Sequence, residues 1–301
     1  MFVMILFCQI TARCEEDFVF VAILIMLRAL RIALVQLAVG SDKKKNIAEA
    51  VKQIHAAKQQ GAQLVALPEC FNSPYGTKYF NDYAEEVPGG ETSLALSRAA
   101  AEAGVCVVGG TLPERCGDRL YNTCTVWDGC GKLLAQHRKM HLFDIDIPGK
   151  ITFKESEALS PGDQFTTFDY EGVKIGIGIC YDLRFSEMSH VLASKGCSLI
   201  IYPAAFNMTT GPKHWELLAR ARANDHQLYV ALVSPARDTE ASYVAWGHST
   251  LVDPWGEVVG KLDENSGVLV CDVDLNKVEE VRNQIPIRSQ RRTDLYDTIT
   301  K

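Results

Sequence analysis

The sequence of 301 residues lacks the cysteine pattern of a disulfide-stabilised protein. Its ten cysteines include no CxxC pair and no regular spacing, and Cys106 and Cys271 lie inside apolar runs. Scattered cysteines of this kind are typical of reduced thiols in an intracellular compartment. We therefore expect a cytoplasmic location, with the mitochondrion as an additional compartment.

Concentrated positive charge and long apolar runs are also missing. The net charge is -6, and no block of like charge is longer than the three lysines at 43–45, so a nucleic-acid partner is not expected. The apolar stretches at 1–7 and 18–27 are shorter than the roughly 18 to 20 residues that span a bilayer, so no membrane partner is expected either. We interpret residues 1–26 as an N-terminal extension that matches neither a secretory nor a mitochondrial targeting signal.

What the sequence has is a regular alternation of strand and helix patterns from residue 27 to 301, without a repeat or a linker, which predicts one α/β domain. The first three elements, at 31–37, 46–60 and 63–67, form a βαβ unit. Further strands are expected at 105–109, 120–127, 132–137, 173–179, 197–202, 228–234, 249–252, 257–262 and 268–273, and further helices at 92–103, 187–195, 212–226 and 276–283.

Cys180 is the most informative residue. It ends the apolar strand 173–179 and precedes a polar turn, after which Ser186 is expected to cap the helix 187–195. A thiol at a strand-to-helix junction is placed as nucleophiles usually are. The alternative is a buried cysteine that acts only as a small hydrophobic residue.

Two other strands deliver a charged residue in the same way. Glu69 follows the buried strand 63–67, and Lys139 follows the strand 132–137. Considered alone, Glu69 would be interpreted as a carboxylate in a turn, and Lys139 as a surface lysine. Together with Cys180 they supply the nucleophile, the base and the positive donor that hydrolysis of an amide requires.

These three positions resemble the nitrilase or carbon-nitrogen hydrolase superfamily. The resemblance lies in segments 67–71, 137–143 and 178–185 and covers residues 27–295. It implies an α-β-β-α sandwich that becomes four-layered in a homodimer. It also implies Glu69 as general base, Lys139 as oxyanion stabiliser, Cys180 as the residue that forms a thioester, and Glu155 as a second glutamate beside the lysine, with Glu157 as the weaker candidate.

Segments 71–76, 141–150, 209–218 and 242–249 are similar to the omega-amidase branch of this superfamily. The branch implies hydrolysis of the terminal amide of 2-oxoglutaramate and 2-oxosuccinamate. Arg184 is the nearest basic candidate for the substrate's distal carboxylate, its alternative being an ion pair with Asp182 or Glu187, and we expect Tyr75 and Asn207 to contact the substrate too.

Several alternatives stay open. A nitrilase or an N-carbamoyl amidohydrolase would share the same three residues, and a non-catalytic relative would keep only the fold. His137 and His141 have a spacing that binds zinc on a helix, but here they flank Lys139 after a strand, so a site-shaping role is favoured. Gly176 and Gly178 resemble half a dinucleotide fingerprint and are better explained by close strand packing. We expect no metal and no cofactor.

Overall fold

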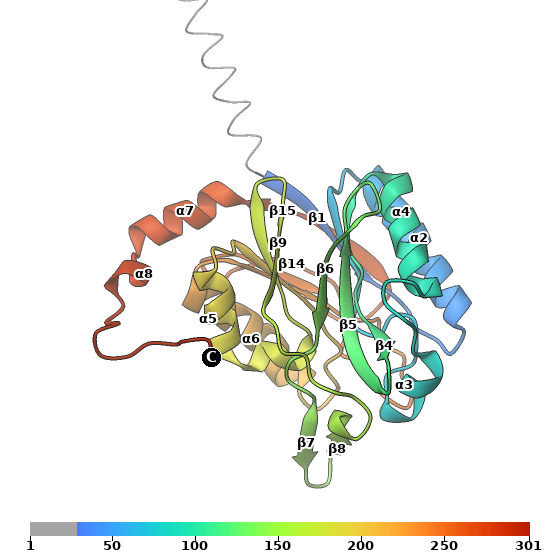
Figure 1. Ribbon diagram of the computed structural model, residues 1–301. Coiled ribbons are helices and arrows are strands. Elements are labelled where there is room, and N and C mark those ends of the chain that lie inside the picture. Colours follow the sequence, from blue (N-terminus) through green and yellow to red (C-terminus); the bar gives the residue numbers. More distant parts are fainter. Residues whose placement is uncertain (1–28) are drawn as a thin grey trace, which may run out of the picture.

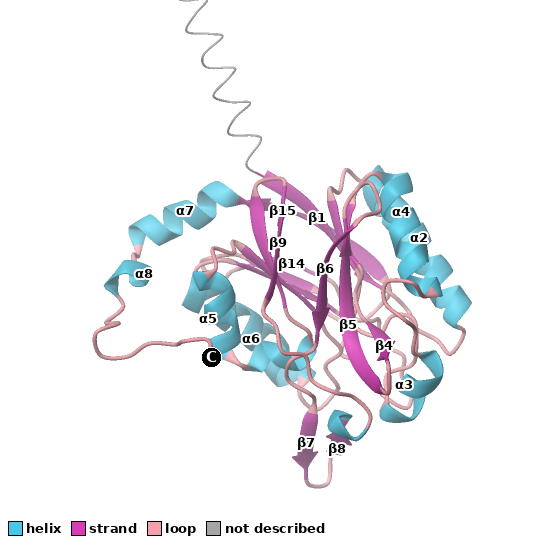
Figure 2. Ribbon diagram, in the orientation of Figure 1, coloured by secondary structure: helices cyan, strands magenta, loops and turns pink. Residues whose placement is uncertain are grey.

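The computed structural model describes residues 29–301 (Figures 1 and 2). The predicted extension, residues 1–26, lies outside the described residues. Within residues 29–301, no helix has both the length and the apolar character that crossing a membrane demands.

Strand β1 (Ala29–Gln36) shows how the layers arise. Ile32 and Leu34 belong to one buried cluster, whereas Ala33 and Val35 belong to another. Because side chains alternate between the two faces of a strand, an unbroken apolar run buries both faces of its sheet. Strand β1 therefore requires a cover on each side.

The first sheet is covered on its outer face by helices α2 (Lys43–Gln59) and α4 (Glu91–Ala103), which lie side by side in Figure 1. Ile54 and Leu96 of these helices pack in one cluster with Val35 of the sheet. In order across the sheet, the strands are β15 (Gly267–Asp274), β1, β2 (Leu64–Ala66), β3 (Cys106–Val108), β5 (Arg119–Trp127) and β4 (Leu112–Cys116), and β6 (Leu133–Arg138) also pairs with β5.

The second sheet is covered by helices α5 (Ser186–Ser194) and α6 (Gly211–His226). Leu192 and Trp215 of these helices belong to the cluster that also holds the residues between the two sheets. In order, its strands are β14 (Val258–Lys261), β13 (Thr250–Val252), β12 (Tyr229–Val233), β11 (Leu199–Pro203), β10 (Val173–Ile177) and β9 (Thr166–Tyr170). The predicted α-β-β-α sandwich is confirmed.

The sequence patterns miss several short elements. Strand β4 contains Pro113, which is tolerated because β4 is an edge strand of its sheet. A projecting hairpin (Figure 2) pairs β7 (Asp144–Ile147) with β8 (Ile151–Lys154), and neither strand has a buried residue. The sequence patterns also miss α3 (Thr77–Tyr83), the 3-10 helix η1 (Glu155–Glu157) and α8 (Ile287–Gln290), whereas α7 (Leu275–Gln284) matches the helix predicted at 276–283.

Candidate active site

Cys180 is presented by a strained turn. Strand β10 ends at Ile177, two residues earlier than predicted, and Cys180 has a φ of 46°, in the left-handed region that non-glycine residues rarely occupy. Gly178 makes this approach possible, since a Cβ there would lie 2.3 Å from Cε1 of Tyr202. The glycine thus serves close strand packing, as the sequence indicated.

The segment after Cys180 corrects one prediction. Cys180 begins a 3-10 helix, η2 (Cys180–Arg184), where a polar turn was predicted. Ser186 does not cap α5. Phe185 occupies the N-cap position without a side-chain cap bond, and Ser186 is already the first helical residue. The short helix η2 therefore spans the residues that the sequence pattern assigns to a simple turn.

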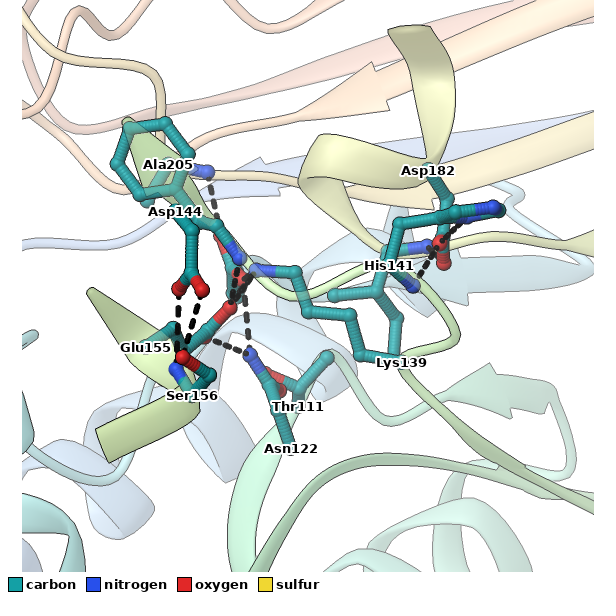
Figure 3. A network of polar contacts seen from close by, with 12 residues as sticks. Thr111, Asn122, Lys139, His141, Asp144, Glu155, Ser156, Asp182 and Ala205 are labelled. Carbon is teal, nitrogen blue, oxygen red and sulfur yellow. Dashed lines mark hydrogen bonds and ion pairs between the residues drawn. The ribbon is translucent and has the colours of Figure 1, made fainter. Parts of the chain in front are cut away.

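Asp182 fixes the Cys180 turn to the segment that carries Lys139. Its Oδ2 accepts a hydrogen bond from the backbone N–H of Ile179 at 2.9 Å, and its Oδ1 accepts from the backbone N–H of His141 at 2.9 Å and lies 2.7 Å from His141 Nδ1 (Figure 3). Nε2 of His137 lies 3.5 Å from Oδ2. Burial works to raise the pKa of Asp182, but the contacts with the two histidines and with the N–H of Ile179 outweigh it and hold the pKa below its ordinary value.

The two histidines therefore face a carboxylate. His137 is buried and its Nδ1 lies 3.0 Å from Thr166 Oγ1, while the ring of His141 stacks on Phe185 at 3.7 Å. In the described part of the chain, no group of three or more His, Cys, Asp or Glu side chains is arranged to hold a metal ion. These contacts indicate a structural role for the two histidines at the site.

Lys139 is held between two glutamates, in full burial (Figure 3). Its Nζ lies 2.9 Å from Oε1 of Glu69 and 2.9 Å from Oε2 of Glu155. The residue that reads alone as a surface lysine has no exposed side-chain area. Of the two glutamates proposed for the second position, Glu155 reaches the lysine, whereas Glu157 is exposed.

Neutral donors complete the bonding of the two carboxylates. Asn122 Nδ2 donates to Glu69 Oε1 at 2.9 Å, and the backbone N–H of Ala205 donates to Glu69 Oε2 at 2.8 Å. The backbone N–H of Phe143 donates to Glu155 Oε2 at 2.7 Å. Sequence reasoning missed these donors. An asparagine inside the otherwise apolar and threonine-rich strand β5 is the one signal that could have pointed to Asn122.

Burial and charge set the protonation of the centre. Burial raises the pKa of Glu69, and Glu155 raises it further, against the opposing effect of Lys139. Burial works to lower the pKa of Lys139, but the charges of Glu155 and Glu69 prevail and the net pKa lies well above the ordinary value. The lysine therefore stays cationic, and Glu69 is the carboxylate suited to accept a proton.

The Cys180 thiol is protonated in the resting site. Burial is the first cause that raises its pKa well above the ordinary value, and the nearby Glu69 is the second. Glu69 and the Cys180 thiol each alter the pKa of the other, so the two groups lie close together. A thiolate then forms only as the proton passes to a nearby base, and Glu69 is the carboxylate placed to accept it.

A cavity of about 320 Å³ opens beside this centre. Glu69 and Tyr75 both line it, and the Tyr75 ring packs 4.6 Å from Tyr243 and 5.6 Å from Phe153, centroid to centroid. The hydroxyl group of Tyr75 donates to Glu155 Oε1 at 3.3 Å. An aromatic wall therefore encloses a space of small-molecule size next to Glu69.

The structure places the other two predicted substrate-binding residues less directly. Arg184 stacks 4.8 Å over Phe206, and its Nη1 lies 3.2 Å from Nδ1 of His214. Within the described chain it forms no ion pair, so the alternative pairing with Asp182 or Glu187 is not what the structure has. Arg184 is also absent from the described lining of the cavity.

Asn207 lies beside the site and is largely buried. Its Oδ1 accepts hydrogen bonds from the backbone N–H groups of Thr209 and Thr210, both at 2.9 Å, whereas Nδ2 has no partner.

A buried cysteine beside a carboxylate and a fixed ammonium, on an α-β-β-α sandwich, is typical of a hydrolase that acts on carbon-nitrogen bonds. The carbon-nitrogen hydrolase family model matches residues 31–283, and the chain belongs to this family. The predicted superfamily is confirmed.

Named relatives are similar over nearly all of their length. The chain is 58% identical to omega-amidase NIT2 of Bos taurus over 271 residues, which is 90% of this chain and 98% of the relative. It is 56% identical to omega-amidase NIT2 of Homo sapiens over 266 residues, with 88% and 96% covered.

Solved structures agree with the fold. Nit3 of Saccharomyces cerevisiae, a member of branch 10 of the nitrilase superfamily, is 42% identical, with a TM-score of 0.81 over 88% of this chain and 97% of that chain. A mutant of the amidase from Nesterenkonia sp. AN1, which shows covalent addition of an acetamide moiety at its active site cysteine, is 26% identical, with a TM-score of 0.70 over 86% and 96%.

Proposed function

We propose that this carbon-nitrogen hydrolase is an omega-amidase. It removes the terminal amide of short dicarboxylic acid monoamides such as 2-oxoglutaramate and 2-oxosuccinamate, and it releases ammonia with 2-oxoglutarate or oxaloacetate. Two relatives of 56% and 58% identity bear this activity in their names. The observation that carries the chemistry is the buried Lys139 held 2.9 Å from both Glu69 and Glu155, next to the thiol of Cys180.

The first half of the reaction forms a thioester. Glu69 takes the proton of Cys180, and Sγ attacks the carbonyl carbon of the amide. The oxyanion that develops is stabilised by the ammonium group of Lys139. When this intermediate collapses, the carbon-nitrogen bond breaks and Glu69 returns its proton to the leaving nitrogen, which departs as ammonia.

The second half hydrolyses the thioester. Glu69, again deprotonated, takes a proton from water, and the oxygen attacks the acyl carbon while Lys139 again stabilises the oxyanion. The carbon-sulfur bond breaks, the acid product leaves, and Cys180 recovers its proton from Glu69. The covalent adduct at the active site cysteine of the Nesterenkonia amidase mutant supports a cysteine nucleophile on this fold.

Glu155 positions the lysine in this mechanism. Its Oε2 contacts Lys139 Nζ and accepts the backbone N–H of Phe143 at 2.7 Å, so the carboxylate is anchored on its far side. A cation held from two sides needs little reorganisation when charge develops on the substrate. Because Glu155 holds the lysine in place, Glu69 can exchange protons.

For substrate binding we propose Tyr75 as part of the cavity wall, with Asn207 and Arg184 as polar contacts near it. Tyr75 lines the cavity directly, and the unpartnered Nδ2 of Asn207 is a donor without an internal acceptor. Arg184 would have to leave its stacking position over Phe206 to meet a carboxylate. Its part therefore depends on a side-chain movement.

Kinetics with four matched compounds test the substrate class. We expect hydrolysis of succinamate to exceed that of its methyl ester, of succinonitrile and of N-carbamoyl-β-alanine by at least about tenfold in kcat/KM, since a site built to bind a polar group discriminates against analogues lacking it. Comparable rates on succinamate, its methyl ester and succinonitrile would instead indicate a general aliphatic amidase or nitrilase. A preference for N-carbamoyl-β-alanine would favour an N-carbamoyl amidohydrolase. Inactivity on all four compounds would indicate a non-catalytic relative.

We also propose a homodimer in which two sandwiches form four layers. Leu217 on α6 is 62% exposed and Trp255 is 41% exposed, an amount of apolar surface that a partner subunit would cover. The free thiols of the described chain support a reducing compartment, the cytoplasm or the mitochondrion as well. We further propose that residues 27–301 form the one hydrolase domain.

A further inference from the structure

The hydroxyl groups on the cavity wall are mostly committed to partners within the protein. Tyr75 donates to Glu155 Oε1 at 3.3 Å, and Tyr243 donates to the backbone oxygen of Ala205 at 2.6 Å. Ser242 is exposed, and it is the first cause that lowers the pKa of Tyr79. The side chains of Tyr75 and Tyr243 can shape the cavity, but their hydroxyl groups are already bonded within the protein.

Ser73 differs from them. It lines the same cavity, it is fully buried, and its Oγ has no hydrogen-bond partner. A buried hydroxyl without a partner costs about 1 to 3 kcal/mol, so such groups are rare without a reason. The backbone N–H of Ser73 donates to the carbonyl of Cys70 at 3.2 Å, which fixes the turn four residues past Glu69.

Burial does not remove Ser73 from the reach of a ligand. Glu69, which must contact the reacting groups, is just as fully buried and lines the same cavity. Both side chains come from one turn after strand β2. A ligand that reaches Glu69 therefore passes the segment that carries the Ser73 hydroxyl.

No positively charged side chain lies on the described wall of the cavity, where it could pair with an anionic substrate. Its charged lining residues are Glu69, Asp238 and Glu240. A carboxylate that leaves water needs hydrogen-bond donors in return, and neutral donors can supply them. An uncommitted hydroxyl on the wall is such a donor.

We propose that Ser73 is a specificity-determining residue whose hydroxyl donates a hydrogen bond to the distal carboxylate of the omega-amide. The proposal rests on the proposed function, because it needs a substrate with that carboxylate. When the substrate binds, its distal carboxylate accepts the hydrogen bond that the Ser73 hydroxyl otherwise lacks. A substrate of equal length without the carboxylate would leave the hydroxyl unpaired.

The test compares succinamate with butanamide, which has the same chain length and lacks the carboxylate. For the parent we expect a higher kcat/KM on succinamate. Ser73→Ala should lower kcat/KM on succinamate about 10- to 100-fold, the usual loss for a hydrogen bond to a charged group, and change butanamide less than threefold. Ser73→Thr, which keeps the hydroxyl, should restore part of the preference.

Ser93→Ala is the matched control. Ser93 is also fully buried with an unpartnered Oγ, but it lies on helix α4 and is not on the described cavity wall. We expect Ser93→Ala to keep the parent's preference. Thermal unfolding of both alanine variants should match the parent within a few degrees, because removal of an unpartnered hydroxyl deletes no bond.

The outcomes separate the two proposals. A parent that prefers succinamate, with Ser73→Ala keeping that preference or losing both activities equally, overturns the role of Ser73 and leaves the omega-amidase intact. A parent without preference overturns both. If Ser73→Ala does not fold, Ser73→Cys has nearly the same shape and only a weak donor, and an unchanged preference in that variant also overturns the inference.

Discussion

Two cysteines occupy turns of similar backbone at the ends of two strands, and only one has the surroundings of a nucleophile. Cys70 follows β2 with a φ of 49°, and Cys180 follows β10 with a φ of 46°. Both thiols are buried, and burial raises the pKa of each well above its ordinary value. Backbone strain and burial therefore do not distinguish them.

The difference lies in what each sulfur touches. Oγ1 of Thr111 lies 3.8 Å from Cys70 Sγ, and the charges of Glu69 and Glu155 act only to raise its pKa. Lys139 lowers the pKa of both thiols, but only Cys180 is among the groups that alter the pKa of Glu69 in return. A thiol becomes a nucleophile where a base can take its proton and a cation can stabilise the resulting charge.

The largest effect is expected for Cys180→Ala. With the nucleophile gone, turnover of succinamate should fall by at least about 10⁴-fold while the fold is kept. Intact mass spectrometry after rapid quenching should show an acyl adduct in the parent and none in this variant. Turnover within tenfold of the parent would show that the acyl group is carried elsewhere.

Lys139→Met should be the next most severe change. Loss of one oxyanion donor costs about 100 to 1000-fold in kcat. The variant also leaves Glu69 and Glu155 facing each other in a buried site, and removal of one partner from a buried pair costs about 3 to 5 kcal/mol. Steady-state kinetics and urea unfolding measure the two effects. A stable variant with nearly full activity would contradict the mechanism.

Asp182→Asn tests what holds the Cys180 turn. The folded pKa of Asp182 lies below that of an unfolded aspartate, so its contribution is complete above about pH 4 and is lost as pH falls toward the folded value. The variant should therefore lose about 1 to 3 kcal/mol of unfolding free energy at pH 7 and less at pH 3. Urea unfolding at both pH values measures this. An equal loss at both would mean that charge plays no part.

The smallest effect is expected for Cys70→Ala. Its thiol contacts no base, so kcat should stay within about threefold of the parent, with a stability loss of about 1 kcal/mol from the buried atom removed. Iodoacetamide should label Cys180 before Cys70, as peptide mass spectrometry after brief exposure would show. Inactivation of Cys70→Ala in a folded protein would place both thiols in the chemistry.

The sequence predicts which residues stand at strand ends. Glu69, Lys139 and Cys180 each follow a recognisable strand, and the structure brings all three together. The reason is that an apolar run followed by a polar residue identifies both the strand and the point at which its chain leaves the sheet.

Contacts between segments that are distant in the sequence could not be predicted in this way. Asn122 reaches Glu69 from β5, two strands away in the same sheet, and Ala205 reaches it from the end of β11 in the second sheet. The full burial of Lys139 and the stacking of Arg184 over Phe206 also depend on how distant segments pack together. The strands of the β7–β8 hairpin have only four residues each and no fully buried residue, so the sequence pattern is too short to indicate them.

The reacting groups come from different sheets, since Glu69 and Lys139 follow strands of the first sheet and Cys180 follows a strand of the second. Their separation is therefore set by the thickness of the apolar layer between the sheets. A displacement of about 1 Å can cost about 100-fold in rate. Substitutions such as Ile177→Val, at a buried position that is not on the described cavity wall, can thus change turnover by altering interior volume. Members of this family can diverge in rate through their cores as well as through their pockets.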